Sequence, residues 1–572
     1  MIYILEDKNN KLSGNTSLYI AFAYNQDIVD IIKEQDAYYY HKDKSLWEVP
    51  IVCLAKLVDA LVYYDDVSFI YEEKVEEVKD VELIGNYKTT PRDYQLDCIK
   101  YGLQHDKFLL LDLPGLGKSL EIMYIAEELE ARHEIEHCLV ICGLASLRTN
   151  WMKEIEKHSR LSGMMLGARI NRNDRLVWDG IPKRVEQLLK PIDEFFVVVN
   201  IETLRDERVI DAIKKGPNKF DMMVIDEGHC IKNSHSIQGQ HLLELSAKHQ
   251  IIATGTPLLN NPLDTYMLLT WIGKESKRGI TRFKNTYCIL SQDVLGGIAG
   301  FKNLELLQDE IDSCSIRRTK DILNLPSKNI IKEELTMNDA QAKFYDTIEK
   351  STNENASNEI KQEAKELCDL VKLKPHFLRS MFTRLRQATA CPQVLTSQKI
   401  ESCKVERAVE LTREILSNKE EKVVIFSQFK EPIYRLKELL QEYNPLVNTG
   451  DIDDGEFSSN VDKFQNDDSY RVFLGTSAKC GTGITLTRAS YMIFIDTPWT
   501  SGEFEQNQDR IHRIGQTKPV FYYNLICKDS VDELVDYLID KKMSLATFVV
   551  DKEVDPKLAW ILKRCVPESL LY

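Results

Sequence analysis

The sequence has no long apolar run. Its longest stretches, such as residues 108–111 (FLLL), are far too short to cross a bilayer. Residues 1–7 lack the basic region and the extended apolar stretch of a secretion signal. We therefore expect a protein that is neither secreted nor membrane-bound. Its expected compartment is the cytoplasm of a bacterial or phage-infected cell, or the nucleus of a eukaryotic one.

Paired cysteines are also missing. The 13 cysteines are scattered and never stand in a Cys-x-x-Cys pair, a common spacing of structural zinc sites. Cys138 and Cys142 fall in an apolar run in which strand alternation points both to one face. A metal site using His133 or His137 is the alternative to buried core thiols. The pattern indicates no disulfide framework and no structural zinc, which fits a reducing compartment.

An excess of positive charge is absent as well. The net charge of −15 excludes binding of nucleic acid through bulk positive charge. It leaves open a local basic strip assisted by backbone amides. With 43% apolar and 28% charged residues, the composition is that of an ordinary globular protein. A chain of 572 residues is too long for one core and indicates about three to five domains.

Five segments differ in pattern. Residues 1–80 predict a small α+β module that ends in an acidic linker. Residues 81–273 alternate short β-rich runs with amphipathic helices, which predicts a parallel sheet covered on both faces. Residues 274–403 are charged and predict a mostly helical insertion, and the alternation returns over residues 404–551. Residues 552–572 form a C-terminal tail. We expect an α/β fold with two parallel-sheet lobes.

The segment of residues 108–119 (FLLLDLPGLGKS) carries the first chemical signal. A buried strand runs into a turn and then a helix start, where backbone N–H groups and the helix dipole form an anion cradle. Gly115 and Gly117 let the backbone approach a phosphate closely. Lys118 can reach the β- and γ-phosphates, and the Ser119 hydroxyl can ligate Mg²⁺. The segment predicts a phosphate loop for ATP.

One position departs from the general phosphate-loop pattern, because Asp112 stands where its first glycine belongs. An ordinary glycine-rich turn is therefore the alternative. A second element favours the nucleotide site: residues 221–229 (DMMVIDEGH) form an apolar strand that ends in Asp226 and Glu227. Carboxylates at the carboxyl end of a parallel strand lie where such sheets bind ligands. Asp226 would hold Mg²⁺ and Glu227 would activate water, with a solvated acidic loop as the alternative.

A third element lies far away in the second lobe, at residues 508–516 (QDRIHRIGQ). Arg510 and Arg513 are three residues apart, which places both on one face of a predicted helix. Guanidinium groups can stabilise charge on a γ-phosphate during its transfer. Binding to acidic neighbours or to DNA phosphate is the alternative.

These elements, in this order, resemble helicase superfamily 2 and its SWI/SNF-like branch over residues 90–551. The further motifs that carry the resemblance are PRDYQ at 91–95, ATGTP at 253–257, SIRRTK at 315–320, LP at 325–326, TRLRQ at 383–387, CP at 391–392, FSQF at 426–429 and GTGITLT at 481–487. The branch also has Asp at the position of Asp112. Leu113 and Pro114 depart from its usual Glu-Met, and Ser119 replaces a threonine while keeping the hydroxyl.

The resemblance implies RecA-like lobes with ATP between them. Gln95 would read the adenine base, and Gly483 would join the nucleotide-binding residues. Thr254, Thr256 and His229 would couple the state of the nucleotide to movement of the lobes. The implied cofactors are ATP and Mg²⁺.

Candidate contacts to DNA come from the basic residues of the insertion and from one tryptophan of the second lobe. They are Arg317, Arg318, Lys320, Arg384, Arg386 and Trp499. Each basic residue also fits a solvated helical face. Trp499 resembles part of the branch's coupling segment, and ordinary packing is its alternative. A motor of this kind follows phosphates and not base edges, so we expect little sequence specificity.

The N-terminal segment is similar to the HARP domain of HepA-related annealing helicases. The similarity rests on residues 24–50, with an aromatic strand, a charged turn and the run LWEVP. The same aromatics fit the core of a small β unit. Residues 1–80 contain 8 lysines, no arginine and 16 acidic residues, so the module makes a poor clamp for phosphate. Docking on the lobes, or on a replication or recombination protein, is the alternative to direct DNA binding.

The sequence predicts a DNA-dependent ATPase that translocates along double-stranded, forked or branched DNA, for annealing or remodelling in replication, repair or recombination. A remodelling factor for RNA polymerase is the first alternative, and a strand-separating helicase is another. A DNA-binding scaffold with an inactive nucleotide site conflicts with the intact Lys118, Asp226 and Glu227.

Overall fold

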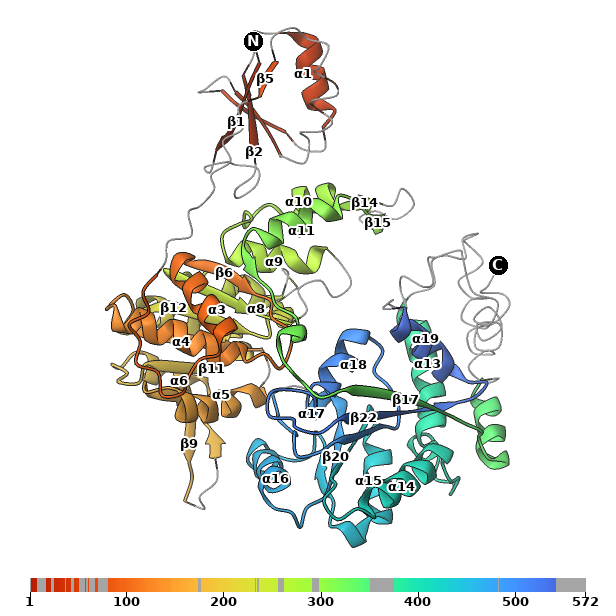
Figure 1. Ribbon diagram of the computed structural model, residues 1–572. Helices are drawn as coiled ribbons and strands as arrows, with labels where there is room; N and C mark the ends of the chain where they lie inside the picture. The colour runs from red at the N-terminus through yellow and green to blue at the C-terminus, as the bar shows by residue number, and fades with distance from the viewer. Residues whose placement is uncertain are drawn as a thin grey trace. The chain divides into compact units, whose positions relative to one another are not determined.

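The computed structural model (Figure 1) describes residues 81–541 with a few gaps, and short stretches before them. The gaps are residues 144, 173–175, 232, 234–235, 256–261, 291–297, 350–374 and 482. Before residue 81, the described residues are 2–7, 17–21, 25–35, 38–42, 46–50, 57, 60 and 67–69. The chain divides into two compact units at Ile322/Leu323.

The N-terminal residues form a five-stranded sheet in the order β3-β4-β2-β1-β5 with one described helix. Its elements are β1 (Ile2–Asp7), β2 (Ser17–Ala21), α1 (Gln26–Lys33), β3 (Tyr39–His41), β4 (Leu46–Pro50) and β5 (Val67–Phe69). β3 and β4 are the predicted aromatic strand and its partner, joined antiparallel with Tyr40 opposite Trp47. The sequence also predicts a helix over about residues 52–61, and all of that stretch except residues 57 and 60 lies outside the described residues.

The first lobe is built on a seven-stranded sheet in the order β16-β6-β13-β12-β7-β11-β8, with every pairing parallel. Its strands are β6 (Lys107–Leu110), β7 (His137–Cys142), β8 (Gly163–Met165), β11 (Phe196–Asn200), β12 (Phe220–Asp226), β13 (His249–Ala253) and β16 (Ser315–Ile316). The central strands are buried on both faces, which is why they read as continuous apolar runs. This sheet confirms the parallel-sheet prediction.

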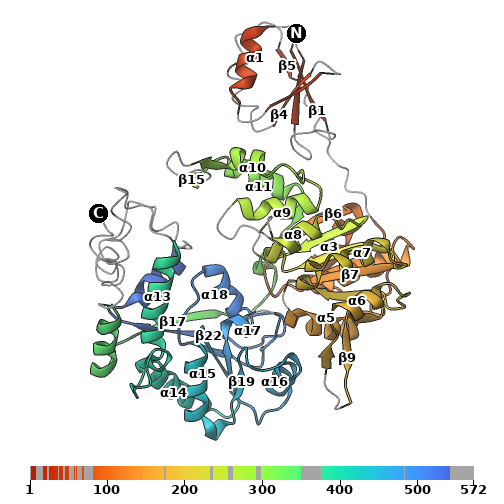
Figure 2. The ribbon, with the colours of Figure 1, turned by 180° about the vertical axis from the view of Figure 1, so that it is seen from behind.

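Helices cover both faces of this sheet. They are α3 (Asp93–Gln104), α4 (Lys118–Ala131), α5 (Ala145–His158), α6 (Ile181–Leu188), α7 (Glu207–Lys215), α8 (Ile237–Leu242) and α9 (Leu263–Trp271). Figure 1 shows α3 and α4 on one side, and Figure 2 shows α7 from behind. Leu139 and Ile141 join one buried cluster, whereas Cys138, Val140 and Cys142 join the other. The two cysteines therefore share a face, as strand alternation predicts.

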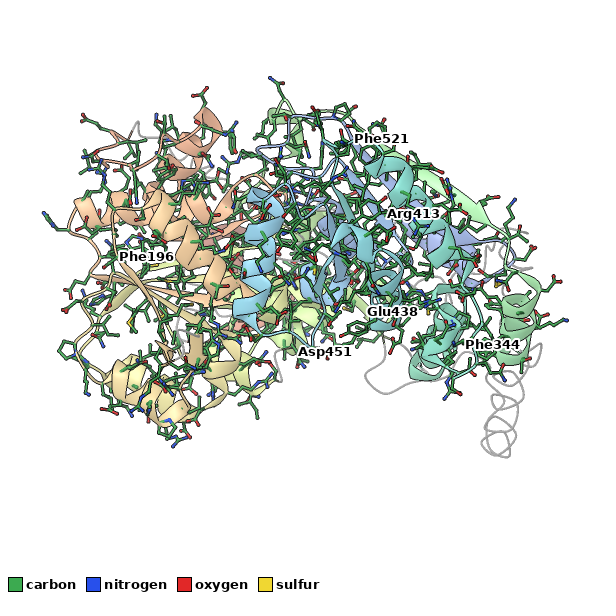
Figure 3. The ribbon with its side chains drawn as sticks, turned by 90° about the horizontal axis from the view of Figure 1, so that it is seen from below. Phe196, Phe344, Arg413, Glu438, Asp451 and Phe521 are labelled. Atoms are coloured by element: carbon green, nitrogen blue, oxygen red, sulfur yellow. The ribbon has the colours of Figure 1, made fainter. Side chains whose placement is uncertain are left out.

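Smaller elements complete the first unit. They are β9 (Ala168–Ile170), β10 (Leu176–Trp178), η2 (Ile201–Arg205), η3 (Gly228–Ile231), α10 (Ile280–Tyr287), β14 (Cys288–Leu290), β15 (Ile298–Phe301), α11 (Leu304–Asp312) and η4 (Lys320–Ile322). Phe196 on β11, labelled in Figure 3, is fully buried in the core of this unit.

The second unit has a six-stranded sheet in the order β17-β22-β21-β18-β20-β19, again with every pairing parallel. Its strands are β17 (Lys328–Leu335), β18 (Val423–Ser427), β19 (Leu446–Asn448), β20 (Val472–Thr476), β21 (Tyr491–Phe494) and β22 (Val520–Cys527). Val423 and Ile425 pack into one buried cluster and Val424 and Phe426 into another, so both faces are covered. The second predicted parallel-sheet lobe is thus present.

The helices of the second unit connect these strands. They are α13 (Pro375–Ala390), η6 (Pro392–Val394), α14 (Cys403–Leu416), α15 (Lys430–Leu439), η7 (Gln441–Tyr443), α16 (Asp454–Asn466), α17 (Ser477–Cys480), α18 (Ser501–Gln508) and α19 (Val531–Asp540). Figure 3 shows Arg413 on α14, whose guanidinium lies 3.0 Å from Glu442. No helix of the described residues is long and apolar enough to cross a membrane.

The expected insertion, residues 274–403, does not stand apart from the lobes. Its β16 extends the sheet of the first lobe, and its β17 pairs with β22 of the second over eight residues. The boundary between the two units falls inside this range, after Ile322. β17 escaped detection because only three of its eight residues are apolar, Ile330, Ile331 and Leu335. Its positions alternate between exposed and half-buried, as suits an edge strand.

Candidate nucleotide site

The phosphate loop connects β6 to α4 at the carboxyl edge of the first sheet. Gly115 and Gly117 have φ angles of 92° and 93°, a left-handed conformation that favours glycine. A Cβ on Gly117 would lie 2.9 Å from the Gln95 side-chain nitrogen, so no larger residue fits there without displacement. α4 begins at Lys118, and its first N–H groups face the loop without helical acceptors. The backbone thus has the shape of an anion cradle.

The side chains that would meet a nucleotide lie around this cradle. Lys118 Nζ donates to the backbone carbonyl of Asp112 at 2.8 Å, and Ser119 is half-buried in the first turn of α4. Gln95, 2% exposed, accepts a hydrogen bond from the Arg92 N–H through its side-chain oxygen. A glycine cradle, an ammonium, a hydroxyl and a carboxylate at the end of another strand of the same sheet form a donor set that fits ATP with Mg²⁺.

That carboxylate is Asp226, the last residue of β12. Its Oδ2 accepts a hydrogen bond from the indole of Trp151 at 2.8 Å, and its Oδ1 accepts one from the Glu227 N–H at 3.0 Å. Burial, with the neighbouring Glu227 charge, raises the pKa of Asp226 to about 6. Trp151, fully buried on α5, orients this group and was missed by the sequence analysis. A tryptophan on an apolar helix face carries no signal of such a role.

Glu227 follows in an unusual backbone conformation. Its φ of 58° places a non-glycine residue in the left-handed region, which costs on the order of 1 kcal/mol and is most common at functional sites. His229 Nδ1 lies 3.3 Å from the Glu227 carboxylate. The two predicted residues, one catalytic and one coupling, are therefore in contact.

Thr254 is the next predicted residue at this edge. It is fully buried, and its N–H donates to the carbonyl of Leu110 at 3.0 Å, at the start of the phosphate loop. A Cβ on Gly255 would lie 2.7 Å from Pro114 Cδ, so this segment packs directly on the loop. Thr256 lies outside the described residues.

Arg318 is placed differently from the expectation of a DNA contact. Its guanidinium lies 2.5 Å from Asp112 and 2.7 Å from Glu121, and both carboxylates are fully buried. It also donates to the carbonyl of Tyr94 and lies 5.2 Å from the centre of the Tyr94 ring. The side chain is 13% exposed. We correct the prediction, because the charge of Arg318 is already matched by carboxylates inside the lobe.

Arg386 requires the same correction. Its side chain is 2% exposed, lies 3.4 Å from Asp496, and donates to the carbonyl of Thr497. The guanidinium carbon lies 4.6 Å from the centre of the Trp499 ring, which also packs near Phe382. Trp499 therefore packs against neighbouring side chains, which is the alternative given for it above. Arg317 and Arg384 are exposed and Lys320 is half-exposed, so these three stay candidates for phosphate contact.

The predicted helix through Arg510 and Arg513 is wrong, because α18 ends at Gln508 and both arginines follow in turns. The Gln516 side chain holds this irregular segment by donating to the carbonyls of Ala489 and Ile511. Even so, both guanidinium groups donate to the carbonyl of Ile484 at 3.2 Å. Their proximity is thus achieved without the helix.

Gly483 lies next to that carbonyl and has a φ of 72°. These three residues belong to the second unit. A role for Arg510 and Arg513 at the γ-phosphate, and for Gly483 in nucleotide binding, stays a prediction.

The fold and the first-lobe site define a phosphate-loop protein with two parallel-sheet lobes, and comparison with known families gives its group. Residues 66–394 match the family model described as the SNF2-related domain, and residues 404–515 match that of the helicase conserved C-terminal domain. The chain belongs to the SNF2-related family.

Curated relatives agree at low identity. A Mycoplasma pneumoniae protein named as an ATP-dependent helicase is 24% identical over 559 residues, covering 96% of this chain and 49% of its own length. A Bacillus subtilis protein named as an ATP-dependent helicase/translocase is 25% identical, covering 84% of this chain and 50% of its own. A TATA-binding protein-associated factor of Saccharomyces cerevisiae is 26% identical, covering 82% and 28%. The chain spans about half or less of the length of these relatives.

A solved structure, the Sulfolobus solfataricus SWI2/SNF2 ATPase core in complex with dsDNA, is 24% identical. The match covers 85% of this chain and 99% of that one, with a TM-score of 0.37.

Proposed function

We propose that this protein hydrolyses ATP at the phosphate loop of its first lobe. The observation that carries the proposal is the convergence of Lys118, Ser119 and Asp226 on one edge of one sheet, beside a loop that only glycine can form. Two sequence segments that were identified separately, residues 108–119 and 221–229, meet there. Membership of the SNF2-related family supports the same activity.

The roles of the residues follow from their places. The cradle N–H groups and Lys118 bind the phosphates, while Ser119 and Asp226 hold Mg²⁺, which supplies charge neutralisation when bound. Trp151 donates to Asp226 Oδ2 and the Glu227 N–H donates to Oδ1, so the carboxylate is held in one orientation. Glu227 accepts a proton from the attacking water, and His229 beside it holds the carboxylate in place. Gln95 accepts a hydrogen bond from the edge of the adenine base or donates one to it.

We further propose that duplex DNA is the track. The support is the set of branch-specific motifs and the helicase and translocase names of the relatives. The negative net charge requires a local contact surface, and the candidates that stay are the exposed Arg317 and Arg384 and the half-exposed Lys320. Annealing or fork remodelling depends on the N-terminal module alone.

The test is ATP turnover with no DNA and with duplex, forked and single-stranded DNA. We expect duplex or forked DNA to raise turnover, and the stimulation to fall steeply as salt rises. Stimulation by single strands alone would favour a strand-separating helicase, and no stimulation by any DNA would remove the proposed track.

The site assignment is tested by two substitutions. Lys118→Ala is expected to abolish nucleotide binding. Glu227→Gln is expected to keep nucleotide binding and to reduce turnover by roughly 10²–10⁴-fold, the usual contribution of a general base. Lys157→Ala, at an exposed position on α5 of the same lobe, is the matched control and keeps full turnover. Normal turnover in Glu227→Gln contradicts the assignment.

A further inference from the structure

The chain leaves the first lobe alongside the phosphate loop. The N–H groups of residues 109, 111 and 113 donate to the carbonyls of residues 314, 316 and 318 at 2.9, 2.8 and 3.2 Å. This ladder continues the parallel pairing of β16 with β6 beyond both strand ends. Residues 314–318 therefore lie beside residues 109–113, from the end of β6 into the start of the phosphate loop. The first unit ends shortly afterwards, at Ile322.

Arg318 closes this ladder with its side chain. Its backbone N–H and its Nε both donate to Asp112 Oδ1, at 2.9 and 3.1 Å, and its Nη2 donates to Asp112 Oδ2 at 2.5 Å. The same Nη2 donates to Glu121 Oε1 at 2.7 Å, and Nη1 donates to the carbonyl of Tyr94. A planar fork with five donors can satisfy this geometry, and an ammonium cannot.

These contacts reach every part of the phosphate loop. Asp112 opens the loop and its carbonyl accepts Lys118 Nζ at 2.8 Å. Tyr94 donates through its hydroxyl to the carbonyl of Leu116, at the tip of the loop, at 2.7 Å. Glu121 lies on the first turn of the helix that follows. One guanidinium thus joins the start, the tip and the end of the loop to the segment that leaves the lobe.

Burial makes the two carboxylates of this site depend on Arg318. The side chains of Asp112 and Glu121 are fully buried, and Glu121 Oε2 has no hydrogen-bond partner among the described residues. Without Arg318, two carboxylates would face each other in a site closed to water, and the loop would have to move to relieve them. The glycine of the general phosphate-loop pattern could not receive this arginine, which accounts for Asp112.

We propose that Arg318 is a positioning residue for nucleotide binding: acting through Asp112, Glu121 and Tyr94, it holds the phosphate loop and Lys118 in the shape that accepts phosphates. The proposal rests on the proposed function, since it assumes that this loop binds ATP. It assigns to the segment around residue 318 a role in the nucleotide site of the first lobe, in place of the DNA contact expected from its basic residues.

The test compares Arg318→Lys with Arg208→Lys, at an exposed arginine on α7 of the same lobe, in the full chain. We measure the affinity for a fluorescent ADP analogue, and KM and kcat for ATP. Arg318→Lys keeps the charge and loses the fork, so the affinity is expected to fall about tenfold, equivalent to roughly 1.4 kcal/mol. KM for ATP rises in step while kcat at saturating ATP changes less. Arg208→Lys leaves ADP affinity unchanged.

A double-substitution cycle separates positioning from general stabilisation. Asp112→Asn and Arg318→Lys each break the same contact, so the double variant is expected to bind ADP no more weakly than the weaker single variant. Hydrogen exchange is expected to increase in peptides covering residues 109–121 and not across the rest of the lobe. Additive losses of affinity, or faster exchange throughout the lobe, overturn the proposal. If the unaltered protein binds no ADP, the proposed function fails instead.

Discussion

Two arginines, one in each lobe, show the same construction. In the first-lobe cluster, Arg318 pairs with Asp112 after β6 and lies over Tyr94. In the second-lobe cluster, Arg386 pairs with Asp496 after β21 and lies over Trp499. Each aspartate follows the carboxyl end of a buried parallel strand and is itself fully buried. Each arginine comes from outside the strand that supplies its aspartate.

The clusters differ in how many residues donate hydrogen bonds to the aspartate. Among the described residues, the Asp112 carboxylate accepts three hydrogen bonds, and all three come from Arg318. Asp496 instead accepts from the Ser427 hydroxyl at 2.5 Å and from the Gln428 N–H at 2.9 Å, with Arg386 at 3.4 Å. In the second cluster, several residues donate to the aspartate, whereas in the first all donors belong to one residue. That residue also touches the phosphate loop.

The comparison explains why both arginines look like DNA contacts in the sequence. Basic residues in a charged, partly helical segment resemble an exposed strip until their partners are known. Here the partners are aspartates that lie far away along the chain, at residues 112 and 496. The segments typical of this branch therefore build internal ion pairs at the sheet edges of both lobes.

The largest effect is expected from Arg386→Met. The substitution leaves Asp496 buried with one partner fewer, in a site where burial already raises its pKa. Breaking a buried pair from one side costs about 3–5 kcal/mol. Denaturant unfolding, followed by hydrogen exchange of peptides from β18 and β21, measures the loss in the second unit alone.

Arg384→Met is the matched control, because it removes an exposed arginine from the same helix, α13. Its effect on unfolding should stay within about 0.5 kcal/mol. Equal effects of the two substitutions would show that the Asp496 pair contributes nothing and would end the comparison. Arg384→Met also tests the DNA surface, since it is expected to weaken binding to duplex DNA if the residue contacts phosphate.

The sequence predicted the layout of both lobes because buried parallel strands read as apolar runs. β12 and β18 illustrate this, since every residue of each is buried. The strand, glycine turn and helix start of the predicted phosphate loop could also be read from the sequence, since they depend on local spacing. Lys118 and Ser119 need only the strand, turn and helix that surround them.

What could not be predicted depends on distant partners. β17 has four charged residues among its eight and no apolar alternation, and only its pairing with β22 makes it a strand. Arg510 and Arg513 meet at the Ile484 carbonyl through turns, which the spacing of three residues misrepresented as a helix. Trp151 orients Asp226 across 75 residues of sequence. No local pattern specifies such a contact.

A smaller effect is expected from Ser427→Ala, which removes the short hydrogen bond from the hydroxyl to Asp496. A buried acceptor that loses one of several donors costs about 1–2 kcal/mol. The substitution tests whether the donors to Asp496 depend on one another. If they do, Arg386→Met has a smaller effect in the Ser427→Ala background than in the unaltered protein. Strict additivity of the two losses, measured by unfolding of the second unit, argues that the donors act independently.

The smallest effects come from the two rings, and they separate the clusters most clearly. Tyr94→Phe keeps the ring beside Arg318 and removes the hydroxyl that donates to Leu116, a loss of about 0.5–1.5 kcal/mol. Trp499→Phe keeps a smaller ring beside Arg386, a loss of about 0.5–1 kcal/mol. Because only Tyr94 contacts the phosphate loop, only Tyr94→Phe should weaken binding of the ADP analogue, by a few-fold. Fluorescence titration of both variants measures this difference. Equal weakening would mean that the first-lobe cluster has no special connection with the nucleotide.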